Sequence, residues 1–478
     1  MIKKIQQDFS YYSHEFKDNY RKGVHRLRTI LASRAQAQAF VSNAGGVAVV
    51  LGYEPETPDK NAQELYALLA ASPYIENAVQ TFLGSIYEAG AESQDAMYAD
   101  SARCLEILHD PVMARAAGAG TVSAGKWIAT LAGQSCNLYR DMNAVAASDI
   151  AMTAVAASET AMAAVVSNAT ALNAVVTSHV ALNAVAASET AMAAVIGNAT
   201  ALNVVATSQA AMNAVAASET AMTALIANTA AFNTVVTSHV AMNAVASSYV
   251  AVAAVYESAV AVEAVKANET AWATLTGASS AVMGKAAAKL AGLNPADYAD
   301  MDAIAASSTA MAAIASSSTA MAAIEKSQVA KDAIAASDMA TAKYAVGAAG
   351  LKPADYANMA AVAASQTAMA AVASSNTART AITNSATAKN ALASSPLKTT
   401  VTKGNGNGWE NRTIRNGMGY LISCYNANSG GEAGSTWYKL DGAQTSQPAG
   451  TTNVGKFFTS SLAIYWWSST SSVTYIPC

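Results

Sequence analysis

A ten-residue repeat occupies residues 141–280 and constrains the fold more than any other feature of the chain. Written in tens from Asp141, it reads DMNAVAASDI, AMTAVAASET, AMAAVVSNAT and ALNAVVTSHV, and it continues in that register. Ten residues at about 100° each fall about 80° short of three helical turns, so an apolar stripe would rotate away from any partner. Coiled coils need periods near seven or eleven, and a continuous coiled coil is therefore disfavoured.

The eighth slot of each decad suggests what the repeat forms instead. It is Ser or Asn in every unit from Ser148 to Asn268, and these residues are preferred helix N-caps. We expect each unit to be one very short helix followed by a corner, with the apolar residues of slots two and five on one face. Such short helices are unstable alone and must pack on their neighbours, as in a solenoid. The expected caps are Ser158, Asn168, Ser178, Ser188, Asn198, Ser208, Ser218, Asn228, Ser238, Ser248, Ser258 and Asn268.

A thirty-residue cycle is superimposed on the decads, because the corners read SET, NAT and SHV in succession. One interpretation is a coil of three short helices per turn. The other is recent duplication of a gene segment with no structural meaning. A parallel β-solenoid is the alternative fold, but Ala and Met favour helix, and few glycines or aromatics are present to line a β-coil.

Between residues 281 and 398 the decads degrade and restart. The element AGLNPADY at residues 291–298 recurs as AGLKPADY at 349–356, and both copies place a Gly three positions before a Pro. That spacing predicts the end of one helix and the start of the next. Ser395 is the last expected cap, with Pro396 at the first helical position.

Residues 1–140 predict a mainly helical domain. Helical patterns cover residues 61–69, 75–89 and 96–109, Gly45-Gly46 and Pro55/Pro58 act as breaks, residues 47–51 are a strand candidate, and residues 118–125 are predicted to be a loop. A basic amphipathic helix precedes them and is more typical of a solvated face than of a binding surface. Its basic residues are Lys17, Arg21, Lys22, His25, Arg26, Arg28 and Arg34. Cys104, His109 and Asp110 are close in sequence, but no second Cys/His/Glu set accompanies them, so we expect no metal or catalytic site.

Residues 399–478 predict a small β-rich head. Short strand patterns cover residues 419–425, 435–440, 456–459 and 461–467, and residues 404–408 (GNGNG) are interpreted as a flexible linker. Exposed aromatics on such a head suit sugar stacking or a protein receptor. A domain of about 80 residues also needs large apolar side chains in its core, so two of Trp437, Trp466 and Trp467 are expected there. The candidate receptor-binding residues are Trp409, Trp437, Tyr438, Trp466 and Trp467.

The composition argues against several classes of function. The net charge of −4 disfavours nucleic acid as the main partner, and no run of about 20 apolar residues predicts membrane insertion. No secretory signal is expected at the N-terminus, and four scattered cysteines indicate neither a disulfide framework nor a metal knuckle. The head offers only Glu410, Glu432 and Asp441 as acids. We therefore expect no enzyme, no cofactor and no metal.

Units such as SETAMAAV and SSTAMAAIASSSTAMAAI, joined to a Gly- and aromatic-rich end, resemble the repeat regions of tailed-bacteriophage tail fibre proteins. The resemblance covers residues 141–395, and the stretch YKLDGAQTSQPAGTTNVGKFF is similar to the ends of such fibres. It implies a virion component, made in the host cytoplasm, whose N-terminal domain attaches to tail or baseplate proteins. The array would then be a spacer and the head a host-receptor adhesin, in a homo-oligomer that can be a trimer. A bacterial surface adhesin or filament subunit, and an ice- or surface-binding repeat protein, are the alternatives.

Overall fold

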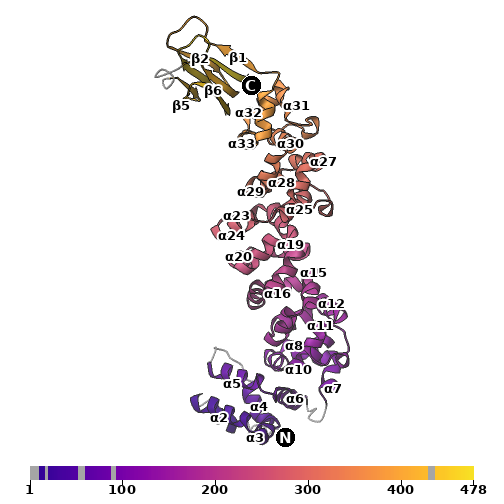
Figure 1. Ribbon diagram of the computed structural model, residues 1–478. Helices are drawn as coiled ribbons and strands as arrows, with labels where there is room; N and C mark the ends of the chain where they lie inside the picture. The colour runs from indigo at the N-terminus through magenta and orange to yellow at the C-terminus, as the bar shows by residue number, and fades with distance from the viewer. Residues whose placement is uncertain (1–9, 17–19, 52–59, 88–92, 429–435) are drawn as a thin grey trace. The chain divides into compact units, whose positions relative to one another are not determined.

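The computed structural model describes residues 10–16, 20–51, 60–87, 93–428 and 436–478 (Figure 1). It forms two compact units, residues 1–245 and 246–478. The protein is 68% helical and ends in an antiparallel β-rich region. The expected fold class is therefore confirmed: mainly α, built from short helices, with a small β-rich C-terminal part.

Helices dominate the described part of the first 140 residues. They are α2 (Tyr20–Ala32), α3 (Arg34–Val41), α4 (Ala44–Leu51), α5 (Lys60–Ala70), α6 (Ile75–Ile86), α7 (Gln94–Ala99), α8 (Ser101–His109), α9 (Pro111–Ala117), α10 (Thr121–Leu131) and the 3₁₀ helix η1 (Cys136–Leu138). The proposed breaks at Pro55 and Pro58 lie outside the described residues.

Three local predictions in this region are wrong. Residues 47–51 are helical rather than a strand, and Gly45-Gly46 lies inside the same helix, α4. Val47, Val49 and Val50 are all buried, and a fully buried apolar run has no period that separates helix from strand. The helical pattern at 96–109 is confirmed, but it is divided into two helices because Asp100 ends α7 and caps α8.

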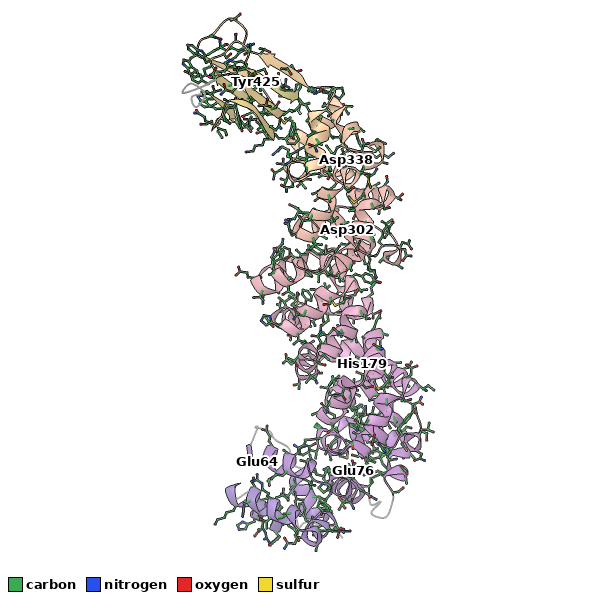
Figure 2. All side chains as sticks on the ribbon, viewed as in Figure 1. Glu64, Glu76, His179, Asp302, Asp338 and Tyr425 are labelled. Atoms are coloured by element: carbon green, nitrogen blue, oxygen red, sulfur yellow. The ribbon has the colours of Figure 1, made fainter. Side chains whose placement is uncertain are left out.

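The glycine-rich stretch 118–125 is mostly helix, because α10 begins at Thr121. The Glu76 carboxylate fixes this helix start by accepting hydrogen bonds from the backbone N–H groups of Val122 and Ser123, at 2.8 and 3.1 Å. Glu76, 46 residues earlier in the chain, thus replaces the cap residue that the sequence lacks at this position. Because the local sequence contains no cap, its glycines predicted a loop. Glu76 is labelled in Figure 2.

The decads form one short helix each. They are α11 (Met142–Ala147), α12 (Asp149–Ala157), α13 (Glu159–Val166), α14 (Ala169–Val176), α15 (His179–Ala187), α16 (Glu189–Gly197), α17 (Ala199–Thr207), α18 (Gln209–Ala217), α19 (Glu219–Ala227), α20 (Thr229–Thr237), α21 (His239–Ser247), α22 (Tyr249–Glu257), α23 (Ala259–Lys266) and α24 (Glu269–Thr276). The chain bends by 98° to 105° between consecutive helices in four measured pairs, such as α14 and α15. The β-solenoid alternative is therefore wrong.

Each of the twelve expected cap residues accepts a hydrogen bond from the backbone N–H three residues later. In α16, for example, the Ser188 hydroxyl accepts from Ala191 N at 3.2 Å. The buried side chains of the same helix are Ala191, Met192 and Val195. The cap and the apolar stripe thus recur together once per decad.

The thirty-residue cycle corresponds to one turn of the coil. Within each unit, helices pack on the helix three places later, as α12 does on α15 and α13 on α16. Several caps also donate a hydrogen bond to a carbonyl 32 residues earlier, at the end of the helix one coil below. Ser178 reaches Ala146 O at 2.5 Å, and Asn198 reaches Val166 O at 3.1 Å. The cycle therefore has a structural meaning, with three helices per coil.

Residues 280–393 contain two longer helices that interrupt the decads. The elements are α25 (Ser280–Leu290), η2 (Pro295–Asp297), α26 (Met301–Ala306), α27 (Ser308–Ser316), α28 (Ser318–Lys326), α29 (Gln328–Ala336), α30 (Asp338–Ala348), η3 (Pro353–Asp355), α31 (Met359–Ala363), α32 (Gln366–Ser374), α33 (Asn376–Asn384) and α34 (Ala386–Ala393). Gly292 and Gly350 end the long helices with φ of +72° and +76°. The Pro starts only a 3₁₀ turn, and the next α-helix begins at the Met that follows.

We call the positive-φ glycine and the 3₁₀ turn that follows it the stop-and-restart element. A third copy, which was not predicted from the sequence, precedes the first decad. Gly133 has φ of +73° and is followed by η1, as Gly292 and Gly350 are followed by η2 and η3. A lysine stands seven residues before each of the three glycines, namely Lys126, Lys285 and Lys343. The buried Lys343 Nζ donates to Pro353 O at 3.1 Å and to Tyr356 O at 3.4 Å. Lys126 Nζ donates to the matching carbonyl of Cys136 at 3.5 Å.

Ser395 does not start another helix, contrary to the prediction. Its buried hydroxyl donates to Ala363 O at 2.5 Å, 32 residues earlier, as the true caps do, and accepts from Leu397 N at 3.1 Å. A single turn follows, and the chain then enters a strand at Thr399.

The C-terminal domain contains two four-stranded antiparallel sheets. The strands are β1 (Thr399–Thr402), β2 (Glu410–Asn416), β3 (Gly419–Asn426), β4 (Trp437–Leu440), β5 (Ala443–Ser446), β6 (Gly450–Phe458), β7 (Ser461–Trp466) and β8 (Ser472–Pro477). One sheet has the order β1-β8-β3-β6 and the other β2-β7-β4-β5. The sequence patterns found β3, β4, β6 and β7 and missed the other four.

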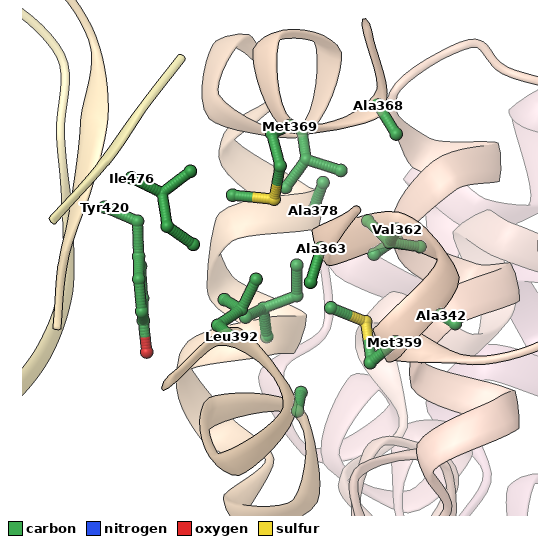
Figure 3. Packing of buried hydrophobic residues seen from close by; sticks show 14 of the residues in the cluster. Ala342, Met359, Val362, Ala363, Ala368, Met369, Ala378, Leu392, Tyr420 and Ile476 are labelled. Carbon is green, nitrogen blue, oxygen red and sulfur yellow. The ribbon is translucent and has the colours of Figure 1, made fainter. Parts of the chain in front are cut away.

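The β1-β8-β3-β6 sheet is covered on both faces. Leu421, Phe458 and Val473 face the other sheet and pack with its Ile464 and Trp466. On the opposite face, Tyr420 and Ile476 point toward Met369 and Leu392 of the last short helices (Figure 3), and these residues form one buried cluster. The β domain therefore closes the end of the helical coil, and Figure 1 shows its strands beside α31–α33.

Alanine substitutions at two cap residues distinguish the stability that comes from the capping hydrogen bond from the stability that comes from the hydrogen bond to the previous coil. Ser188 caps α16 and also donates to Ala156 O, whereas Ser208 caps α18 with no cross-coil hydrogen bond in the described structure. Loss of a cap costs about 1 kcal/mol, and a buried carbonyl left unpaired costs about 1–3 kcal/mol more. We expect Ser188→Ala to lower the free energy of unfolding by more than Ser208→Ala does, as measured by chemical denaturation. Equal losses would contradict a cross-coil contribution.

Replacing Lys343 by Met tests the stop-and-restart element. The change keeps an unbranched buried side chain, shorter by the terminal nitrogen, but leaves the carbonyls of Pro353 and Tyr356 without their donor. We expect a loss of about 1–3 kcal/mol, seen as a lower melting temperature of residues 246–478. Lys352→Met, at an exposed lysine of the same element, is the control; a loss as large there would indicate a general effect of removing charge.

Candidate ligand-binding face of the C-terminal domain

One face of the C-terminal domain is not covered by other described residues: the outer face of the β2-β7-β4-β5 sheet. Strand alternation in β7 shows which side chains lie on this face. Leu462, Ile464 and Trp466 are buried between the sheets, so the side chains between them point to the outer face. Tyr465 is one of these, and it is paired across the sheet with Trp437 and Asn411.

Four aromatic residues form a row on this face, which we call the aromatic row: Trp409, Tyr465, Trp437 and Trp467. The Trp409 and Tyr465 rings stack with centroids 4.8 Å apart and an interplanar angle of 9°. Trp437 stacks on Tyr465 at 5.3 Å and 18°, and Trp467 lies tilted against Trp409 at 5.4 Å. The rings therefore cover much of one another's faces.

Lys439 closes one end of the row. Its Nζ lies 4.6 Å from the centroid of the Trp437 ring, within the range of a cation–π contact. No salt bridge joins this ammonium to a carboxylate within the described residues. The row thus has a cation at the end formed by β4.

The structure divides the five predicted receptor-binding residues into two groups. Trp409, Trp437 and Trp467 lie in the aromatic row, whereas Tyr438 and Trp466 are buried between the sheets. Only Trp466 of the three tryptophans considered for the core is fully buried, so the expectation of two is wrong. Tyr465 was missed, although alternation along 461–467 would have placed it opposite Trp466.

Polar side chains surround the aromatic row. The strand register places Asn411 beside Tyr465, Ser446 beside Trp437, and Gln444 beside Lys439. All three polar residues are exposed. Amides and hydroxyls can both donate and accept hydrogen bonds, so the face combines stacked aromatics, hydrogen-bonding groups and one cation.

Asp441 lies between β4 and β5 of this sheet, and its carboxylate is used within the fold. Asp441 and Gly442 both have positive φ, 53° and 87°, and form the tight turn between β4 and β5. The carboxylate accepts from the N–H groups of Thr459, Ser460 and Ser461 at 2.9, 2.6 and 3.1 Å. Partial burial raises the pKa of Asp441, but these hydrogen bonds outweigh it and lower the pKa to about 2.

The glycine-rich stretch 404–408 is not a linker, contrary to the prediction. It connects β1 to β2 inside the β domain and is tied to the β7–β8 connection. Gly404 N donates to Ser469 O and Gly408 N to Trp467 O, both at 3.0 Å, while Lys403 Nζ donates to Gly406 O at 2.8 Å. The loop therefore supports the end of the row at Trp409 and Trp467.

The other residues weighed in the sequence do not form a site within the described structure. Cys104 is buried, and burial raises the pKa of its thiol to about 12. Asp110 caps α9 by accepting from Val112 and Met113. No group of three metal-ligating side chains occurs among the described residues. Glu432 and Lys17 lie outside them.

The basic residues near the N-terminus are partly paired. Arg28 lies 3.5 Å from Glu64 (Figure 2), and Arg26 lies 3.9 Å from Glu15. The side chains of both arginines remain more than half exposed. This arrangement is that of a solvated helix face with surface ion pairs.

Rows of polar residues in the coil are used within the helices. The hydroxyls of Thr177, Thr207 and Thr237 donate to carbonyls four residues earlier, at 2.8 to 3.1 Å. The serine caps are likewise engaged at their own helix starts. His179 (Figure 2) and His239 lie exposed in matching positions two coils apart. The regular hydroxyls that motivated an ice-binding surface therefore already have partners.

Comparison with known proteins gives no family. No family model matches the chain, and no curated protein matches it. A solved structure described as the crystal structure of an engineered protein aligns with 15% identity, 81% coverage of this chain, 89% coverage of that chain and a TM-score of 0.23. Among the described residues, no single helix is long and apolar enough to cross a membrane. Four pairs of consecutive helices have the required length and hydropathy when the two helices are counted together, but each pair is bent by 98° to 105°.

Replacing Asp441 by Asn tests its role in the fold. The folded pKa lies below the ordinary value of 3.8, so the carboxylate contributes stability above about pH 4 that is lost as the pH falls toward 2. Asn tolerates the positive φ, so the turn is preserved. We expect a loss of about 1 kcal/mol at pH 7, after allowance for solvent screening, and almost none at pH 2. Thermal melts against pH measure it, with Asp355→Asn as the control; a pH-independent difference would contradict the assignment.

Proposed function

We propose that this chain is a structural virion protein of the tail fibre type, acting as a spacer and as a host-receptor adhesin. The observation that carries the proposal is the outer face of the β2-β7-β4-β5 sheet. The opposite sheet is covered on both sides, by the coil and by its partner sheet, so one aromatic face is left for a ligand. That is the expected arrangement for an adhesin domain fused to its support.

The helical arrays support the spacer role. Each coil buries Ala, Met and Val and repeats the same contacts, so adding thirty residues adds one coil without altering the others. Most slots of the decads are Ala, Val, Met, Ser, Asn or Thr, and the described residues contain no group of three metal-ligating side chains, which favours a mechanical role over a catalytic one. Under this proposal the N-terminal region attaches to tail or baseplate proteins, and the C-terminal domain contacts a polysaccharide or protein on the host.

The proposal includes assembly as a homo-oligomer in the virion, with a trimer as one candidate number of chains. The resemblance of the decads to tail fibre repeats motivates this number. Light scattering of the purified protein measures it, and a strictly monomeric chain at micromolar concentration would count against this part of the proposal.

Antibody labelling tests the proposed function. Antibodies against the purified chain should decorate the tails of phage particles produced by a culture that carries this gene, as seen by negative-stain electron microscopy. Labelling of the bacterial surface in the absence of particles would favour the alternative, a bacterial surface adhesin or filament subunit. Particles that contain no trace of the chain by mass spectrometry would refute the proposal.

A further inference from the structure

We propose that the outer face of the β2-β7-β4-β5 sheet binds an acidic, carboxylate-bearing polysaccharide. This inference rests on the proposed function, because it gives a ligand class to the same face. It follows from the orientation of the aromatic rings and from the charges around them.

The rings of the aromatic row leave little flat surface for a sugar. Tyr465 is stacked between Trp409 and Trp437, at 4.8 and 5.3 Å, and Lys439 covers the end of the stack at Trp437. A ligand that approaches the sheet therefore meets ring edges. The edge of an aromatic ring is the positive end of its quadrupole, so it favours electron-rich oxygen atoms.

The charged side chain that contacts the row is a cation. Lys439 supplies an ammonium at one end and has no carboxylate partner within the described residues. Glu410, an acid of the same sheet, is paired with the inward-pointing Trp466 in the strand register, on the other side of the sheet from the row. The Asp441 carboxylate accepts hydrogen bonds from Thr459, Ser460 and Ser461. The face therefore complements an anionic ligand.

The polar neighbours suit a polymer of sugars. Asn411, Tyr465, Trp437 and Ser446 lie side by side across four strands. At about 4.8 Å per strand, these four side chains extend over roughly 14 Å, which is longer than one sugar ring. Hydroxyls and amides can bond both sugar hydroxyls and carboxylates.

Binding of two polysaccharides to the full chain tests the inference: alginate, a polyuronate, and dextran, a neutral polymer. We expect alginate to retard the protein in affinity electrophoresis and dextran not to, with weaker binding at higher salt. Lys439→Gln should weaken alginate binding about threefold to tenfold, and Trp437→Ala at least as much. Lys456→Gln, at an exposed lysine of the other sheet, is the matched control and should bind as the wild type does.

Several results would overturn the inference. Equal binding of dextran, or alginate binding unchanged by Lys439→Gln, would remove the acidic ligand class. Loss of binding in Lys456→Gln alone would place the site elsewhere. Melting curves identify any variant that has failed to fold, and Lys439→Gln changes a half-buried side chain on the outer face of the sheet without opening the core. If neither polymer binds while the antibody labels virion tails, this inference fails and the proposed function stands.

Discussion

The structure depends on one side chain per decad, the Ser or Asn that begins each short helix. Its oxygen accepts a hydrogen bond from the helix that it starts, and in many decads its hydroxyl or amide donates to the helix one coil earlier. Helices of eight or nine residues are too short to persist alone in water. The cap supplies both the local start and the link that sets three helices per coil, so the helices become stable only as a stack.

A stack of this kind needs its ends closed, because the last coil would otherwise expose its apolar face. At the C-terminal end the β domain does this, with Tyr420 and Ile476 set against Met369 and Leu392. One sheet is thereby committed to packing. The aromatic face of the other sheet is free for a ligand because the closing sheet stands between it and the coil.

The sequence predicted the parts of the fold whose signals are local. The Ser/Asn slot, the ten-residue period and the Ala/Met/Val composition were sufficient to predict short capped helices, and the thirty-residue cycle left three helices per coil as one of two interpretations. Two features were not predicted. The start of α10 depends on Glu76, which lies 46 residues away in the sequence, and the third stop-and-restart element lacks the Pro that identified the other two.

The sequence predicted which types of residue form the candidate site, but not which side chains point to the outer face of the sheet. Trp409, Trp437 and Trp467 lie in the aromatic row, whereas Tyr438 and Trp466 do not, because adjacent residues of a strand point to opposite faces. The strands β1, β2 and β5 are polar or mostly exposed edge elements, so they carry no hydrophobic alternation to detect.

The distance between exposed residues thirty apart tests the three-helix coil most directly. Spin labels at Asn173, Asn203 and Asn233 would occupy the same slot of α14, α17 and α20, in a chain whose native cysteines are replaced by Ala. The coil predicts a backbone separation of about 10 Å for the first pair and about twice that for residues sixty apart, as measured by electron paramagnetic resonance. A separation near 45 Å for the thirty-residue pair, the length of a continuous helix, would contradict the account.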